Sequence, residues 1–71
     1  MNTPIIKNTI SENIRDLRLK KGISQDRLSK LADLSLNTIV KIESGKNKNP
    51  TIVTLVKIAK SLNVMVDGLI K

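Results

Sequence analysis

Seventy-one residues are enough for one small domain, and 13 Lys and Arg against 6 Asp and Glu give it a formal net charge of +7. The sequence has no Cys, His, Phe, Tyr or Trp, which excludes disulfides and Cys/His zinc sites and leaves an aliphatic core. No apolar run approaches the ~20 residues of a membrane span and no signal-peptide core follows Met1, so we expect a cytoplasmic protein.

The first part of the chain divides into an arm and a helix. Residues 1–8 lack hydrophobic periodicity and predict an N-terminal arm, which leaves residues 9–71 for the folded domain. The first helix is predicted to begin at Thr9, which forms a capping box with Glu12, and to end at Gly22. Its apolar stripe consists of Ile10, Ile14 and Leu17.

Residues 24–45 predict two short helices joined by a tight turn. Ser24 caps the first of them, and Ser35 caps the second after a turn at residues 33–35. Gly45 closes the second helix in the same way as Gly22 closes the first helix of the chain. The apolar stripe before the turn consists of Leu28, Leu31 and Ala32.

The helix predicted over residues 36–44 has two unlike faces, one of them occupied by Ile39 and Ile42. An exposed amide and an exposed lysine on a short helix of a basic chain favour reading of base edges in a DNA major groove. A plain amphipathic helix of a small bundle is the alternative, and this face alone does not decide between them. The outer face consists of Leu36, Asn37, Val40, Lys41 and Ser44.

The last third of the chain predicts a polar loop at residues 46–50, a fourth helix capped by Thr51 and ended by Asn63, and a short helix over residues 67–70. Gly68 within the short helix costs about 1 kcal/mol relative to Ala. None of the apolar stripes is wide enough for its helix to be stable by itself. The sequence therefore predicts an all-α fold of five helices around one core. The fourth helix contributes Leu55, Ile58, Ala59 and Leu62.

The positive charge predicts an anionic partner: nucleic acid, an anionic membrane or an acidic protein. Membrane-surface helices and single-strand binders commonly rely on aromatic side chains, which this chain lacks. Duplex DNA requires only cations and groove-reading side chains, so composition favours it. The sequence shows no metal-ligand cluster, phosphate-binding glycine loop or nucleophile–base pair, and we therefore expect no enzyme activity, cofactor or metal.

Five motifs follow one another along the chain: Ile14-Arg15-x-Leu17-Arg18, Gly22-Ile23-Ser24-Gln25-x-x-Leu28, Leu34-Ser35-x-x-Thr38-Ile39-x-x-Ile42-Glu43-x-Gly45, Pro50-Thr51 and Leu55-x-x-Ile58-Ala59-x-x-Leu62-x-Val64. Their joint spacing resembles that of the phage lambda-repressor and Cro-like (XRE) helix-turn-helix family. The resemblance covers residues 10–70 and implies a five-helix DNA-binding domain, commonly a homodimer on a palindromic operator, that regulates transcription and is expected to repress it.

The resemblance implies a role for each matching position. Arg18 and Glu43 match a structural ion pair between the first and third helices. The resemblance implies base contacts by Leu36, Asn37 and Lys41. Val40 lies close to them on the same face and is expected to contact bases as well. The expected phosphate contacts are Gln25, Ser35, Ser44, Lys46 and Lys48.

Three positions depart from the family pattern. Ser29 stands where Ala is common and needs a hydrogen bond, Asp33 stands where Gly is common and implies mild strain, and Gly68 is rare at its position.

The end of the chain has more apolar residues than one small core needs, which predicts a homodimer interface. The alternative function is an antitoxin-like module that neutralises a partner protein and regulates its own operon. The predicted interface consists of Val56, Val64, Met65, Val66 and Ile70.

Overall fold

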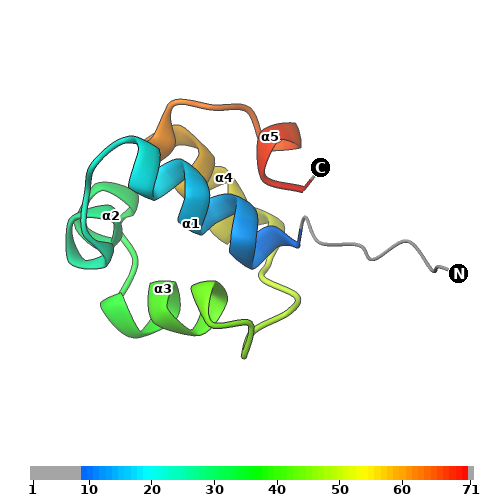
Figure 1. Cartoon of the computed structure of the whole chain (residues 1–71). Coiled ribbons are helices and arrows are strands. Elements are labelled where there is room, and N and C mark those ends of the chain that lie inside the picture. Colours follow the sequence, from blue (N-terminus) through cyan, green and yellow to red (C-terminus); the bar gives the residue numbers. More distant parts are fainter. Residues whose placement is uncertain (1–8, 71) are drawn as a thin grey trace, which may run out of the picture.

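Five helices follow one another in the computed structural model, which describes residues 9–70 (Figure 1). The described residues contain no strand, so the predicted all-α class is confirmed. The predicted arm at residues 1–8 lies outside the described residues, as does Lys71. The helices are α1 (Ile10–Lys20), α2 (Gln25–Ala32), α3 (Leu36–Glu43), α4 (Ile52–Leu62) and α5 (Asp67–Ile70).

A hydroxyl side chain caps the N-terminus of each of the first four helices, as the sequence predicts. Each capping oxygen accepts a hydrogen bond of 3.0–3.2 Å from the backbone N–H three residues later. These bonds satisfy backbone donors that have no partner within the helix, and they fix where each helix begins. The caps are Thr9, Ser24, Ser35 and Thr51.

Left-handed backbone conformations follow the same four helices. Gly22 and Gly45 have φ values of +71° and +84°, which glycine adopts without a steric cost. Asp33 and Asn63 reach φ values of +57° and +58°, so the mild strain expected at Asp33 is present. The helix predicted over residues 36–44 ends one residue earlier, because Ser44 is its C-cap.

The core is aliphatic, and all five helices contribute to it. One predicted core residue is wrong: Leu31 is 48% exposed. On α2 the buried face is centred on Leu28, Ser29 and Ala32, which turns Leu31 toward solvent. The buried aliphatic residues are Ile14, Leu28, Ala32, Ile39, Ile42, Leu55, Ile58, Ala59, Leu62 and Leu69.

Ser29 takes an inward position because it is small enough to lie between packed helices. Its hydroxyl donates a hydrogen bond of 2.7 Å to the Asp26 carbonyl, which supplies the partner that a buried hydroxyl needs.

The short helix α5 is held against α1 despite the glycine in it. Asn13 Nδ2 donates a hydrogen bond of 2.8 Å to the Leu69 carbonyl, and the Leu69 side chain is fully buried. Figure 1 shows α5 close to the first turns of α1. No helix of residues 9–70 has the length and apolar character to cross a bilayer.

We predict that Gly68→Ala stabilises the protein by about 0.4–1 kcal/mol and raises Tm by about 2–8 °C. Gly68 lacks a positive φ, and an added Cβ meets Val64 Cβ at an ordinary van der Waals distance of 3.7 Å, so the substitution does not strain the folded state. Its main effect is to reduce the conformational entropy of the unfolded chain. Thermal denaturation followed by circular dichroism measures the change.

Gly22→Ala is the matched control, because a Cβ there meets nothing within 4 Å but the backbone has a φ of +71°. It is expected to destabilise by about 1 kcal/mol. A decrease in stability for both variants would contradict the placement of Gly68.

Candidate nucleic-acid interface

Helix α3 presents two parallel rows of side chains on its outer face. Leu36 and Val40 form an apolar row and are 43% and 39% exposed. Asn37 and Lys41, also exposed, form a polar row beside it. Residues four apart are neighbours on a helix surface, so this short helix offers amide, ammonium and aliphatic groups together. Figure 1 shows α3 along one edge of the molecule.

The loop after α3 is tied to the end of that helix. Asn47 N donates a hydrogen bond of 3.0 Å to the Lys41 carbonyl, and Asn49 N donates one of 3.1 Å to Asn47 Oδ1. The exposed Lys46 and Lys48 therefore belong to a loop that folds back against the last turn of α3. Two cations in this place suit an anionic backbone that runs past the helix.

The hydroxyl groups of Ser35 and Ser44, two of the predicted phosphate contacts, form hydrogen bonds within the chain. Ser35 Oγ accepts from Thr38 N at 3.0 Å and lies 2.8 Å from Thr38 Oγ1. Ser44 Oγ donates to the Lys41 carbonyl at 3.2 Å and accepts from Lys46 N at 3.4 Å. A phosphate must compete with these contacts for either hydroxyl proton, and the two assignments stay predictions.

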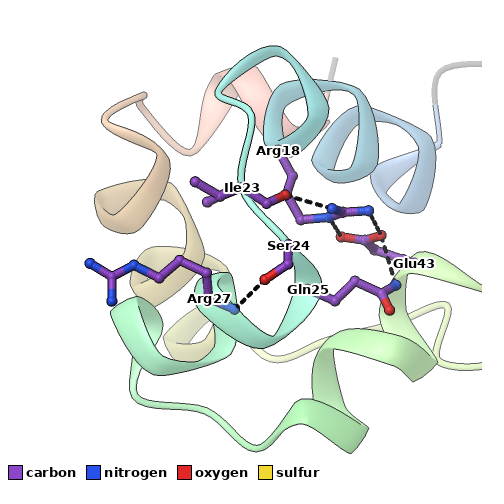
Figure 2. Close-up of polar contacts among 6 residues, drawn as sticks. All are labelled: Arg18, Ile23, Ser24, Gln25, Arg27 and Glu43. Atoms are coloured by element: carbon purple, nitrogen blue, oxygen red, sulfur yellow. Dashed lines mark hydrogen bonds and ion pairs between the residues drawn. The ribbon is translucent and has the colours of Figure 1, made fainter.

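A buried ion pair joins α1 to the end of α3 (Figure 2). Arg18 Nε donates to Glu43 Oε2 at 2.7 Å, and Nη2 donates to Oε1 at 3.1 Å. Arg18 Nη1 also donates to the Ile23 carbonyl at 2.7 Å, in the segment between α1 and α2. The two side chains are only 11% and 3% exposed, so the pair predicted from the sequence forms in a site with little water.

Gln25 belongs to the same network, which the sequence did not predict. Its Nε2 donates a hydrogen bond of 3.0 Å to Glu43 Oε1, from the first residue of α2 (Figure 2). An amide has a second N–H and a carbonyl oxygen, so this bond is compatible with the predicted phosphate contact. Glu43 thus connects α3 with both α1 and α2, and these contacts fix the direction in which the outer face of α3 points.

The predicted dimer interface divides into exposed and partly buried residues. Met65 and Ile70 are 78% and 50% exposed, whereas Val64 and Val66 pack partly against the core. Ile52, at the start of α4 beside Val53, is a further exposed aliphatic residue, at 63%, and the sequence analysis did not single it out. A shallow hollow of about 330 Å³ is lined by Val56, Ala59, Lys60, Val64, Met65, Val66 and Asp67.

In the described part of the chain, no group of three or more Asp or Glu side chains is arranged to hold a metal ion.

Comparisons with known proteins agree on one family. A model described as helix-turn-helix matches residues 14–69. Control protein C.SmaI of Serratia marcescens is 35% identical over 65 residues, which cover 92% of this chain and 76% of that protein. An uncharacterized HTH-type transcriptional regulator of Archaeoglobus fulgidus is 38% identical over 56 residues, 79% of each chain.

A solved structure shares the same fold. The restriction-modification controller protein C.AhdI from Aeromonas hydrophila superposes with a TM-score of 0.81 at 30% sequence identity. The match covers 84% of this chain and 89% of that one.

We predict that Glu43→Ala destabilises the fold by about 3–5 kcal/mol, because it leaves the Arg18 guanidinium buried without its counter-charge. That loss is a large share of the stability of a small domain. Urea denaturation measures it.

Asp26→Ala is the control, because it removes the exposed Asp26–Lys30 pair and is expected to cost at most about 0.5 kcal/mol. Equal decreases in the free energy of unfolding for the two variants would show that the buried pair contributes no more to stability than the exposed pair.

Proposed function

This chain belongs to the helix-turn-helix family, and from that premise we propose that it is a sequence-specific regulator of transcription that binds duplex DNA through α3. The observation that carries the proposal is the outer face of α3, where an apolar row and a polar row lie side by side on a helix fixed by Glu43. The outer face of α3 is exposed to solvent, and the chain has a net charge of +7. Nothing in the fold requires two half-exposed aliphatic residues on that face.

Each group on α3 suits a particular base edge in the major groove. Asn37 suits the N6 and N7 positions of adenine, and Lys41 suits the O6 and N7 positions of guanine. Leu36 and Val40 suit the C5 methyl groups of thymine. The half-site is therefore proposed to combine A·T pairs with a guanine.

The contacts to phosphate come from the elements on either side of α3. Gln25 begins α2, where backbone N–H groups favour an anion, and Lys46 and Lys48 lie in the loop tied to the end of α3. Ser35 and Ser44, at the two ends of α3, complete the set. Such contacts set the position of the protein on the duplex and make binding depend on salt.

The proposed regulator is a homodimer that pairs through the exposed apolar residues at the end of the chain. Met65, Ile70 and the hollow beside Val56 supply the apolar surface that pairing needs. A two-fold dimer that reads one face of DNA requires its α3 helices ~34 Å apart, so the operator is a near-palindrome with half-site centres ~10 base pairs apart, or a multiple of that.

The names of two similar proteins indicate which genes the proposed regulator controls. One structural neighbour is a restriction-modification controller, and one sequence relative is a control protein. We propose that this chain likewise controls the genes of a restriction-modification system, and that it represses them when it covers their promoter.

We predict that Asn37→Ala and Lys48→Ala weaken DNA binding in different ways. Asn37→Ala should cost about 1–3 kcal/mol on the operator and little on random duplex DNA, because it removes a contact to a base. Lys48→Ala should weaken binding to all sequences alike and reduce the salt slope by about one, because it removes a contact to phosphate. Fluorescence anisotropy over a range of salt concentrations measures both, on an operator selected from a random duplex pool.

Equal losses for Asn37→Ala on operator and random DNA would reject reading of bases by α3. A changed base preference for Lys48→Ala with an unchanged salt slope would reject its phosphate contact.

We predict that Met65→Lys gives a folded monomer with weak affinity for single half-sites, because a charge at a 78% exposed position disturbs an interface but not the core. Leu19→Lys is the matched control, an exposed leucine on α1 outside the proposed interface, and it should leave the dimer intact. Analytical ultracentrifugation measures the mass. A monomeric unmutated protein at ~100 µM, with undiminished affinity for the operator, would reject the dimer, since specific affinities are usually ~10⁻⁸–10⁻¹¹ M.

A further inference from the structure

A groove between α2 and α4 contains no residue of α3, and it shares only Lys60 with the hollow at the proposed dimer interface. It has a volume of about 380 Å³, and neither α3 nor the loop after it contributes to its lining. We call it the α2–α4 groove, and its residues are Leu31, Ala32, Asp33, Lys57, Lys60 and Ser61.

Leu31 supplies the apolar part of this groove. It is 48% exposed although its spacing on α2 matches that of core residues, because the small Ser29 takes the inward position. A half-exposed leucine in this groove provides an apolar surface against which an apolar side chain of another molecule can pack.

Two lysines, Lys57 and Lys60, line the groove together with Leu31. Among the described residues the ion pairs are Arg18–Glu43 and Asp26–Lys30, so neither Lys57 nor Lys60 has an acidic partner within 4.0 Å. Arg27 lies one turn before Leu31 on α2, and Figure 2 shows its side chain pointing away from the Arg18–Glu43 network. Asp33 is the single acid in the lining.

We propose that the α2–α4 groove docks an acidic segment of a partner protein, with one apolar side chain placed against Leu31 and carboxylates facing Lys57 and Lys60. Charge complementarity selects this occupant. A DNA backbone would satisfy the lysines but has no apolar group to cover the leucine. A second copy of this chain is a poor occupant, since it has only 6 acidic residues and a charge of +7.

The docking site goes beyond the proposed regulation of transcription because it remains accessible while α3 occupies DNA. The groove is built from α2, α4 and Asp33 of the turn after α2, whereas the proposed base and phosphate contacts lie on α3 and its two caps, the loop after it and the first residue of α2. A partner with an acidic segment can therefore bind the protein and its operator together.

The test is a nuclear magnetic resonance titration of the ¹⁵N-labelled full chain with a synthetic peptide. The probe has about 15 residues, with leucines at helical spacing among glutamates, and the comparison peptide has lysines in place of the glutamates. The expected result is a set of shift changes confined to the α2–α4 groove that appears with the acidic peptide alone. Added salt should weaken the binding.

Two variants and two matched controls identify the groove. Leu31→Gln and Lys57→Glu should each weaken peptide affinity about tenfold. Leu31→Gln removes the apolar contact surface, and Lys57→Glu reverses a charge. Leu19→Gln and Lys20→Glu make the same changes on α1 and should leave peptide affinity unchanged. Circular dichroism verifies that all four variants are folded, and Leu31→Gln should keep the operator affinity of the unmutated protein.

Any of four results would overturn the proposal. These are equal binding of the two peptides, shift changes centred on α3 or Met65, loss of operator affinity in Leu31→Gln, and a changed monomer–dimer equilibrium in Leu31→Gln. The third result would assign the groove to DNA, and the fourth would assign it to a second copy of the chain.

Discussion

The buried carboxylate of Glu43 is the contact on which the geometry of the outer surface depends. Its two oxygens accept hydrogen bonds from Arg18 on α1 and from Gln25 on α2, and it lies at the last residue of α3. Burying two charges is costly unless their hydrogen bonds are complete. That condition is met, because no buried side-chain nitrogen or oxygen of the described residues lacks a partner. The network thereby holds three helices in one relative arrangement.

The core contains no aromatic side chain, so the packing of the helices depends on aliphatic and small residues. A core of Ile, Leu and Ala fills little volume, so helices of 8 to 11 residues must approach closely. Ser29 permits that approach on α2, and the left-handed Asp33 makes the sharp turn into α3. These two departures from the family pattern are therefore accommodated by local contacts, a hydrogen bond in one case and modest backbone strain in the other.

The cations of the chain lie in separate groups on different elements. Arg18 is buried and structural, while Lys41, Lys46 and Lys48 lie on α3 and the loop folded against it. Lys57 and Lys60 lie on α4, away from that loop. Net charge alone does not distinguish these groups, since it predicts only an anionic partner. Their separation on different elements leaves room on one small domain for both the proposed DNA contact and the proposed protein contact.

Local sequence determined where the helices begin, which residues fill most of the core, and the family to which the chain belongs. Capping at Thr9, Ser24, Ser35 and Thr51 depends on hydrogen bonds that span three residues, so each could be predicted without the rest of the fold. Only the tertiary structure decided that Leu31 faces solvent, that Gln25 bonds to Glu43, and how far each valine near the C-terminus is buried. Hydrophobic spacing defines an apolar stripe on a helix, whereas the rotation of that helix about its own axis is set by the neighbours against which it packs.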